Sequence, residues 1–224
     1  MGAEGIPASI PEAIKIVDQH RKRWYGMIKD ISGRIGMNRL TEGDLVVNIG
    51  CGGGLDGLPI NSALSGQPYG ATGKIKLVGI DLDQKALQVA EKSNRGEVEK
   101  YIHGDARNLG KLLGSQKPTV AIARHPDIIG KETEWEEIFK ETYKTLKDGG
   151  TFIITSMQGY ERKRVERALK DAGFELVIDE ENAFVGETNL GNSSIQYDKY
   201  IAVGIKRKNV LHPDPQIERK SGSK

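Results

Sequence analysis

Residues 45–49 form an apolar run that ends abruptly in glycines, and this junction constrains the fold more than any other feature. The run is Leu-Val-Val-Asn-Ile, and Gly-Cys-Gly-Gly-Gly follows at residues 50–54. A strand buried on both faces in a parallel sheet has a nearly continuous hydrophobic sequence. Glycines directly after it let the backbone turn tightly and approach a ligand where a Cβ would collide. The pattern therefore predicts a parallel sheet with a ligand at the end of one strand.

A second apolar run, at residues 77–80, ends in Asp81. An acidic residue at the end of the second strand of a nucleotide-binding fold is placed to hydrogen-bond the two hydroxyls of a ribose. A glycine loop combined with such a carboxylate predicts a cofactor that contains a nucleoside.

The glycine loop can be aligned with two different motifs. The sequence GGGLDG at residues 52–57 fits the dinucleotide pattern G-x-G-x-x-G, which a glycine-rich loop matches easily. The sequence NIGCGGG at residues 48–54 resembles the first motif of the class I S-adenosylmethionine-dependent methyltransferases, in which an acidic residue precedes a G-x-G-x-G loop. Further segments resemble the later motifs of that family in order: VGIDLD at 78–83, YIHGDA at 101–106, the fourth strand and its loop at 119–127, and LKDGGTFII at 146–154.

The resemblance covers roughly residues 40–205. It implies an α/β fold, Rossmann-like and doubly wound, with a mostly parallel seven-stranded sheet and a terminal antiparallel hairpin. It also implies S-adenosylmethionine as the cofactor. The cofactor-binding positions that it implies are Asn48, Gly50, Cys51, Gly52, Gly54, Asp81, Leu82, Asp105 and Ala106.

Several of these positions have more than one interpretation. Asn48 stands where the family has an acidic residue, and an amide cannot neutralise the ammonium group of the cofactor. The resemblance implies that Asp105 contacts the adenine amino group, and capping of the following helix is the alternative. Asp83 is better suited to cap the helix that begins at Gln84 than to bind a ligand. Cys51 is expected to pack in the loop.

Arg124 and His125 stand at the predicted end of the fourth strand, where the family presents residues to the methyl acceptor. A histidine can act as a general base near neutral pH. An arginine can hold a carboxylate or a phosphate. We therefore interpret His125 and Arg124 as candidate catalytic residues, with a loop hydrogen bond or a surface ion pair as the structural alternative.

The remaining sequence alternates between strand and helix patterns, which predicts a parallel sheet with helices on both faces. Trp24 and Tyr25 lie in the first predicted helix, where they either cover the cofactor or pack in the core. Two strand-like runs near the end, at 174–179 and 197–205, have no helix between them and should pair antiparallel. We expect an N-terminal helical extension or lid at 1–43, a cofactor-binding domain at 44–205 and a basic flexible tail at 206–224. The predicted strands are 44–49, 76–81, 98–102, 119–123 and 151–156, and the predicted helices are 10–31, 83–94, 132–146 and 161–172.

Composition narrows the class of protein. The single cysteine excludes an internal disulfide. The sequence also shows no signal pattern and no apolar run long enough for a membrane span, and these features together favour a cytoplasmic protein. The four histidines show no spacing typical of metal ligands, so no metal is expected. Residues 206–224 hold six basic and two acidic residues, which gives this tail a net charge of +4. Because the whole chain has a net charge of +2, the remaining residues have a net charge of −2.

These features together predict a methyltransferase that uses S-adenosylmethionine. A small-molecule acceptor is favoured, because the chain without residues 206–224 is slightly acidic and no RNA-binding module is attached. An RNA or protein acceptor comes next. Two other classes stay open: an oxidoreductase that uses NAD or NADP, and a non-catalytic subunit that binds S-adenosylmethionine. The sequence does not indicate an oligomeric state.

Overall fold

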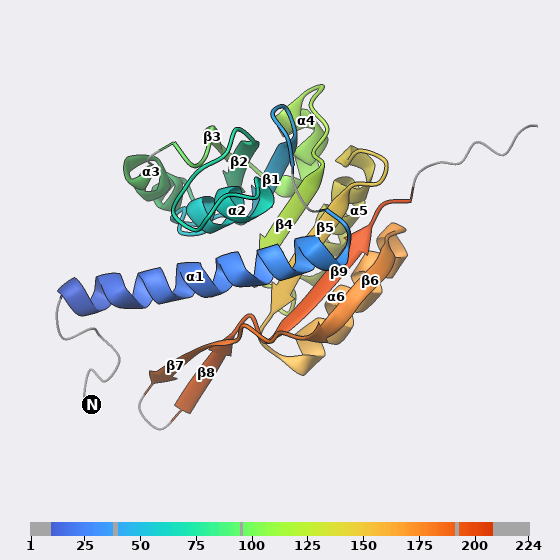
Figure 1. Ribbon diagram of the computed structural model, residues 1–224. Coiled ribbons are helices and arrows are strands. Elements are labelled where there is room, and N and C mark those ends of the chain that lie inside the picture. Colours follow the sequence, from blue (N-terminus) through green and yellow to red (C-terminus); the bar gives the residue numbers. More distant parts are fainter. Residues whose placement is uncertain (1–9, 38–39, 95, 191–192, 208–224) are drawn as a thin grey trace, which may run out of the picture.

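The computed structural model describes residues 10–37, 40–94, 96–190 and 193–207. Seven strands form one sheet in the order β3-β2-β1-β4-β5-β9-β6, and β7 and β8 form a separate two-stranded sheet. Figure 1 shows the large sheet between two layers of helices, with the small hairpin projecting from one end. The strands are β1 (Leu45–Ile49), β2 (Lys76–Asp81), β3 (Lys100–His103), β4 (Val120–Arg124), β5 (Thr151–Ser156), β6 (Glu175–Glu181), β7 (Gly186–Leu190), β8 (Ser193–Tyr197) and β9 (Tyr200–Ile205).

The central strands are parallel, as predicted, and their bounds lie within two residues of the expected ones. β1 pairs with β2 and with β4, and β4 pairs with β5, each in parallel register. All five residues of β1 and all six of β5 are buried, which is why apolar residues make up most of β1 and the centre of β5. The carboxyl ends of β1, β2 and β4 consequently meet at one edge of the sheet, where ligands bind in open α/β folds.

Helices cover both faces of this sheet. Apolar residues of α1 and α2 pack with one face, and residues of α4, α5 and α6 pack with the other. The doubly wound Rossmann-like fold with seven strands is therefore confirmed. The helices are α1 (Ile10–Arg34), α2 (Gly57–Leu64), α3 (Gln84–Ser93), the 3₁₀ helix η1 (Ala106–Asn108), α4 (Leu109–Leu113), α5 (Glu132–Thr145) and α6 (Gly159–Ala172).

The long N-terminal helix α1 is fixed to the body through its second half. Trp24, Met27, Ile28 and Ile31 are at most 2% exposed, so the interpretation of Trp24 as a core residue is confirmed. The Tyr25 hydroxyl donates to the carbonyl of Gln67, in the insertion between α2 and β2. The first half of α1 extends past the sheet (Figure 1).

The C-terminal strands differ from the prediction in one respect. β9 pairs antiparallel with both β5 and β6, which confirms the terminal antiparallel arrangement. The run at 197–205 is not one strand, however, because it breaks after Tyr197. Asp198 takes a left-handed φ of 56°, which turns the chain from β8 into β9. The β7–β8 hairpin was not predicted from the sequence.

In the part of the chain that the structure describes, no helix combines the length and the apolarity needed to cross a bilayer. The basic tail lies outside the described residues from position 208 onward, as do residues 1–9 of the predicted N-terminal extension.

Asp44, just before β1, gives a prediction for acid stability. Burial opposes its charged form, but hydrogen bonds from Thr41, Thr119 and Lys147 outweigh burial and lower its pKa to about 2. An unfolded aspartate has a pKa of about 3.9, so ionised Asp44 should stabilise the fold by roughly 2 kcal/mol above pH 4. This contribution should disappear as the pH falls from about 4 to about 2.

Urea unfolding of the wild type and Asp44→Asn between pH 7 and pH 3 measures this effect. The difference in free energy of unfolding should be largest near neutral pH and should shrink at the acid end. Asp148→Asn, which removes an exposed carboxylate, should change stability little. A difference for Asp44→Asn that stays constant with pH would contradict the assignment.

Candidate active site

The glycine loop after β1 adopts backbone conformations that only glycine adopts readily. Gly50, Gly52 and Gly54 have φ values of 69°, 50° and 76°. A Cβ on Gly54 would lie 2.7 Å from the Tyr101 hydroxyl and 2.8 Å from the Ala90 Cβ. A Cβ on Gly50 or Gly52 would meet no atom within 4 Å, so these two glycines face open space. The loop therefore presents bare backbone to a ligand.

Asp81, at the end of β2, is tied to this loop. Its Oδ2 accepts a hydrogen bond of 2.7 Å from the backbone N–H of Gly52, and its Oδ1 accepts one of 2.8 Å from that of Asp83. Each carboxylate oxygen retains a second lone pair, because a carboxylate has about four acceptor sites. The carboxylate thus holds the loop and can still accept hydrogen bonds from a ribose.

A pocket of about 410 Å³ opens beside Asp81, and we call it the nucleoside pocket. Its volume lies within the usual range for ligand sites. Its lining combines apolar side chains with carboxylates, which suits a purine ring and a ribose. Its lining residues include Ile49, Gly50, Ile80, Asp81, Leu82, Gly104, Asp105, Ala106, Trp135 and Ile138.

The nucleoside pocket contains several predicted cofactor positions. Leu82, Asp105 and Ala106 line it together with Gly50 and Asp81. Asp105 also caps η1, since its Oδ1 accepts from the backbone N–H of Arg107. The hydrogen bond from the Arg107 side chain opposes burial and holds the pKa of Asp105 below its usual range, so the carboxylate is charged at neutral pH. Asp83 caps α3 through the N–H groups of Lys85 and Ala86, as predicted.

Cys51 and Asn48 are both buried beneath the loop. Burial raises the pKa of the Cys51 thiol to about 12, and the nearby Asp81 adds to that effect. Because the thiolate is the nucleophile, Cys51 is inert at neutral pH. Asn48 is 4% exposed, and within the described residues its side chain makes no hydrogen bond. Asn48 lines neither the nucleoside pocket nor the pocket beside α1, so its predicted contact with the cofactor stays a prediction.

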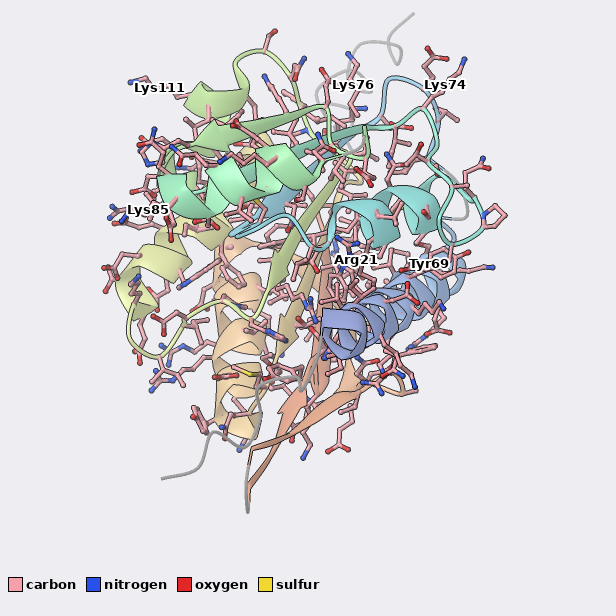
Figure 2. The ribbon with its side chains drawn as sticks, turned by 90° about the vertical axis from the view of Figure 1, so that its left-hand side faces the viewer. Arg21, Tyr69, Lys74, Lys76, Lys85 and Lys111 are labelled. Atoms are coloured by element: carbon pink, nitrogen blue, oxygen red, sulfur yellow. The ribbon has the colours of Figure 1, made fainter. Side chains whose placement is uncertain are left out.

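A second pocket, of about 280 Å³, is lined in part by the two residues that follow the glycine loop, and we call it the α1 pocket. Arg21 lies on the side of α1 that faces α2 (Figure 2), and its Nε donates to the carbonyl of Leu55. The pocket is lined by Val17, His20 and Arg21 of α1, Leu55 and Asp56 after the glycine loop, Arg124 and His125 of the β4 end, and Tyr197 of β8.

Arg124 is held in a buried network instead of projecting freely into this pocket. Its Nη1 donates to Asp56 at 2.8 Å, and its Nη2 donates to Asp198 at 2.7 Å. Its guanidinium carbon lies 5.0 Å from the centre of the Trp24 ring. With two carboxylates already bound, Arg124 has little capacity left to hold an acidic group of a substrate.

His125 contacts the same network. Its Nε2 lies 2.8 Å from Oδ1 of Asp198 and 3.0 Å from the backbone nitrogen of Asp198. The Thr155 hydroxyl also donates to Oδ1 of Asp198, at 2.7 Å. The ring of His125 lies 6.0 Å from the ring of Tyr197. Both predicted catalytic residues therefore lie at one pocket and share one carboxylate.

The two carboxylates of the network have opposite pKa shifts. Burial raises the pKa of Asp56, and Arg124 offsets this only in part. Burial also opposes ionisation of Asp198, but hydrogen bonds from His125 and Arg124 outweigh it and hold the pKa of Asp198 well below its usual range. Asp198 is thus the carboxylate that keeps its charge beside His125.

Sequence reasoning did not identify Asp56, Asp198, His20 or Tyr197 as site residues. The sequence contained one indication that α1 contributes to the site. Arg21 interrupts the series of apolar residues at helical spacing in α1, and it lines the α1 pocket. Among the described residues, no group of three histidine, cysteine or carboxylate side chains is arranged to hold a metal ion.

Comparisons with known proteins agree with this arrangement. A family model described as a methyltransferase domain matches residues 46–150. A ribosomal protein L11 methyltransferase of Listeria monocytogenes is 32% identical over 144 residues, which are 63% of this chain and 40% of that protein. A protein of the same name from Bacillus licheniformis is 29% identical over 140 residues, again 40% of its length. The chain thus spans well under half of these relatives.

Solved structures show the same fold at low sequence identity. A methyltransferase of Clostridium acetobutylicum has a TM-score of 0.59 at 14% identity, covering 84% of this chain and 92% of that one. A Methanosarcina mazei methyltransferase has a TM-score of 0.56 at 17% identity, covering 76% and 96%. Magnesium protoporphyrin IX methyltransferase of Synechocystis, solved with S-adenosylmethionine, has a TM-score of 0.54 at 15% identity, covering 84% and 80%.

The family model covers the glycine loop, Asp81, Asp105 and the β4 end, and so the whole lining of the nucleoside pocket. It covers only part of the α1 pocket, because α1 and Tyr197 lie outside residues 46–150. The nucleoside pocket suits S-adenosylmethionine, the cofactor of the matched family. Over residues 46–150 the chain is therefore similar to the methyltransferase-domain family, and its fold is the Rossmann-like fold of the solved S-adenosylmethionine-dependent methyltransferases.

Proposed function

We propose that this protein transfers the methyl group of S-adenosylmethionine to a small molecule bound in the α1 pocket. The observation that carries the proposal is that residues at the two ends of one glycine loop line two different pockets. Gly50 lines the nucleoside pocket, and Leu55 and Asp56 line the α1 pocket. A cofactor laid across the loop would carry its reactive methyl group from the first pocket toward the second.

The size and surroundings of the α1 pocket support a small acceptor. At about 280 Å³ the pocket is near the lower end of the range for ligand sites. Arg21 lines it and, among the described residues, forms no ion pair within 4 Å, so its guanidinium can pair with an acidic group of the acceptor. Two other basic residues labelled in Figure 2, Lys85 and Lys111, lie on α3 and α4 away from Arg21, and so do not form one basic surface with it.

Each residue has a distinct role in this proposal. The bare backbone of Gly50 and Gly52 would approach the cofactor, and Asp81 would accept hydrogen bonds from its ribose. When bound, S-adenosylmethionine supplies an activated methyl group and its own leaving group. The protein then mainly has to place the acceptor in line with the bond that breaks. His125 would accept a proton from the acceptor where one is lost.

Methylation of a protein is the second candidate. The curated relatives are named for a ribosomal protein, and this is the observation that favours it. A shallow groove of about 400 Å³ along Ile14, Val17, Asp18 and Arg21 adjoins the α1 pocket and could receive a side chain from a larger partner.

Transfer of a labelled methyl group separates the candidates. The protein is incubated with methyl-labelled S-adenosylmethionine and, in separate reactions, with the small-molecule, protein and RNA fractions of a cell extract. We expect label in the small-molecule fraction, and much less of it with Asp81→Ala at a cofactor concentration below the Kd of that variant. Label in protein or RNA would contradict the proposed acceptor, and no label in any fraction would favour a non-catalytic binding subunit.

Asn48 provides a separate prediction about cofactor affinity. If its buried amide faces the ammonium group of the cofactor, Asn48→Asp should bind S-adenosylhomocysteine more tightly, because a carboxylate attracts that ammonium group and an amide does not. Isothermal titration calorimetry of both proteins at pH 7 measures the change. Equal or weaker binding by a folded Asn48→Asp protein would mean that this position does not face the ammonium group.

A further inference from the structure

Apolar side chains of α1 lie exposed next to the α1 pocket. Ile14 is 64% exposed, Val17 is partly buried, and Leu55, just after the glycine loop, is 51% exposed. Ile14, Val17 and Arg21 are spaced by three and four residues, so they lie on one face of the helix. Together with Asp18 they line the shallow groove of about 400 Å³, which we call the α1 groove. Exposed apolar residues that gather along a groove mark a binding surface.

The α1 groove continues into the α1 pocket, because Val17 and Arg21 line both cavities. Leu55 lines the pocket, and its carbonyl accepts a hydrogen bond of 3.0 Å from Nε of Arg21, so Leu55 lies near the place where the two cavities join. Figure 1 shows this half of α1 extending past the sheet. One molecule can therefore occupy the pocket and extend along the groove.

Arg21 lies at this junction with its charge uncompensated. Its Nε donates to the carbonyl of Leu55, but among the described residues its guanidinium forms no ion pair within 4 Å. A guanidinium binds a carboxylate through two parallel hydrogen bonds, and such charged hydrogen bonds are stronger than neutral ones. A ligand with a carboxylate at this point would therefore compensate the charge of Arg21.

Other charged groups around the two cavities already have partners. Asp18 pairs with Lys22 at 2.8 Å and accepts a hydrogen bond of 2.8 Å from the Tyr69 hydroxyl. Arg124 is held by two carboxylates. Burial, with a smaller effect of nearby arginines, lowers the pKa of His20, so its ring is neutral at neutral pH. A basic ligand at the junction would meet the like charge of Arg21, whereas an acidic ligand would meet the opposite charge.

We propose that the methyl acceptor is an amphiphilic carboxylic acid, whose carboxylate pairs with Arg21 and whose apolar chain lies in the α1 groove. This inference rests on the proposed methyl transfer and extends it to the class of substrate. Contact of the chain with Ile14 and Val17 removes apolar surface from water, and the resulting stabilisation increases with chain length. A membrane needs only an exposed surface, whereas the join with a pocket of about 280 Å³ favours a single molecule.

Calorimetric titration of the full-length protein with simple carboxylates tests both contacts. The probes are hexanoate, octanoate and decanoate, added in the presence of saturating S-adenosylhomocysteine, and 1-octanol serves as the uncharged counterpart of octanoate. A fully buried methylene group lowers Kd about fourfold. Because the groove is shallow, we expect a decrease of about twofold for each added methylene group.

Two variants with matched controls assign each contact. Arg21→Gln can still donate to the Leu55 carbonyl, and it should weaken octanoate binding about tenfold while 1-octanol binds as before. Arg23→Gln removes the same charge from α1 but no residue that lines the cavities, so it should bind octanoate as the wild type does. Ile14→Asn should remove most of the dependence on chain length. Ile16→Asn should retain it, because Ile16 is exposed on α1 and lines neither cavity.

An affinity that does not rise from hexanoate to decanoate, or that rises equally in Ile14→Asn, would overturn the proposal. An equal loss of octanoate and 1-octanol binding in Arg21→Gln would do the same. Sedimentation of the wild type, but not of Ile14→Asn, with phosphatidylglycerol vesicles would assign the groove to a membrane surface and would also overturn it.

Titration of the same samples with S-adenosylhomocysteine keeps these results separate from the proposed function. Binding of S-adenosylhomocysteine without binding of any of the carboxylates refutes the amphiphilic acceptor alone. A failure to bind S-adenosylhomocysteine refutes the proposed methyl transfer.

Discussion

His125→Gln should lower turnover by roughly 10²- to 10⁴-fold, the usual contribution of a general base. The glutamine amide can fill part of the space of the imidazole but cannot accept a proton at neutral pH. Affinity for S-adenosylhomocysteine should stay nearly unchanged, because His125 lines the α1 pocket and not the nucleoside pocket. Formation of S-adenosylhomocysteine, measured with the acceptor found in the labelling experiment, provides the rate.

The pH dependence distinguishes a base from a residue that only shapes the pocket. The wild-type rate should fall on acidification, because a protonated ring cannot accept another proton, and His125→Gln should lose this dependence. His103→Gln, which removes a histidine at the end of β3, should leave turnover at saturating cofactor unchanged. Two results would contradict the role of His125 as a base: normal turnover in His125→Gln, or a wild-type rate that does not change with pH while the chemical step is rate-limiting. Catalysis would then depend on placement of the acceptor alone.

Asp81→Ala should weaken the binding of S-adenosylhomocysteine by roughly 1.5–3 kcal/mol, or about 10- to 150-fold in Kd. The substitution removes the acceptor of the ribose hydroxyls. It also removes the carboxylate that holds the N–H groups of Gly52 and Asp83. Asp81→Asn keeps one acceptor oxygen and should therefore lose less binding free energy than Asp81→Ala. Calorimetric titration of each variant provides the affinity.

Asp83→Asn is the matched control, because asparagine can also cap a helix and Asp83 caps α3. It should bind S-adenosylhomocysteine as the wild type does. Unchanged affinity in Asp81→Ala would remove Asp81 from the cofactor site.

The nucleotide-binding half of the fold could be predicted because its signals are local. A buried parallel strand has an apolar sequence, and a loop such as Gly50–Gly54 needs glycine for its backbone angles. The bounds of β1, β2 and β5 follow from these signals alone. Asp83 was recognisable as a helix cap for the same reason, since a cap depends on the residues that follow it directly.

The α1 pocket could not be predicted because it depends on contacts between distant segments. Asp198 lies in a run that resembles one strand, and only the folded structure brings it to His125, 73 positions away. The β7–β8 hairpin was missed because its second strand continues into that same run. Asp56 lies 68 positions from Arg124, and nothing next to it in the sequence indicates a buried ion pair.

The most direct measurement of the central claim is calorimetric titration of the wild-type protein with S-adenosylhomocysteine and, separately, with NAD⁺ and NADH. The two pockets around one glycine loop predict that S-adenosylhomocysteine binds at one site per chain with a Kd of about micromolar magnitude, near −8 kcal/mol. They predict no binding of either form of NAD. Binding of NAD⁺ or NADH without binding of S-adenosylhomocysteine would contradict the account and favour the oxidoreductase alternative.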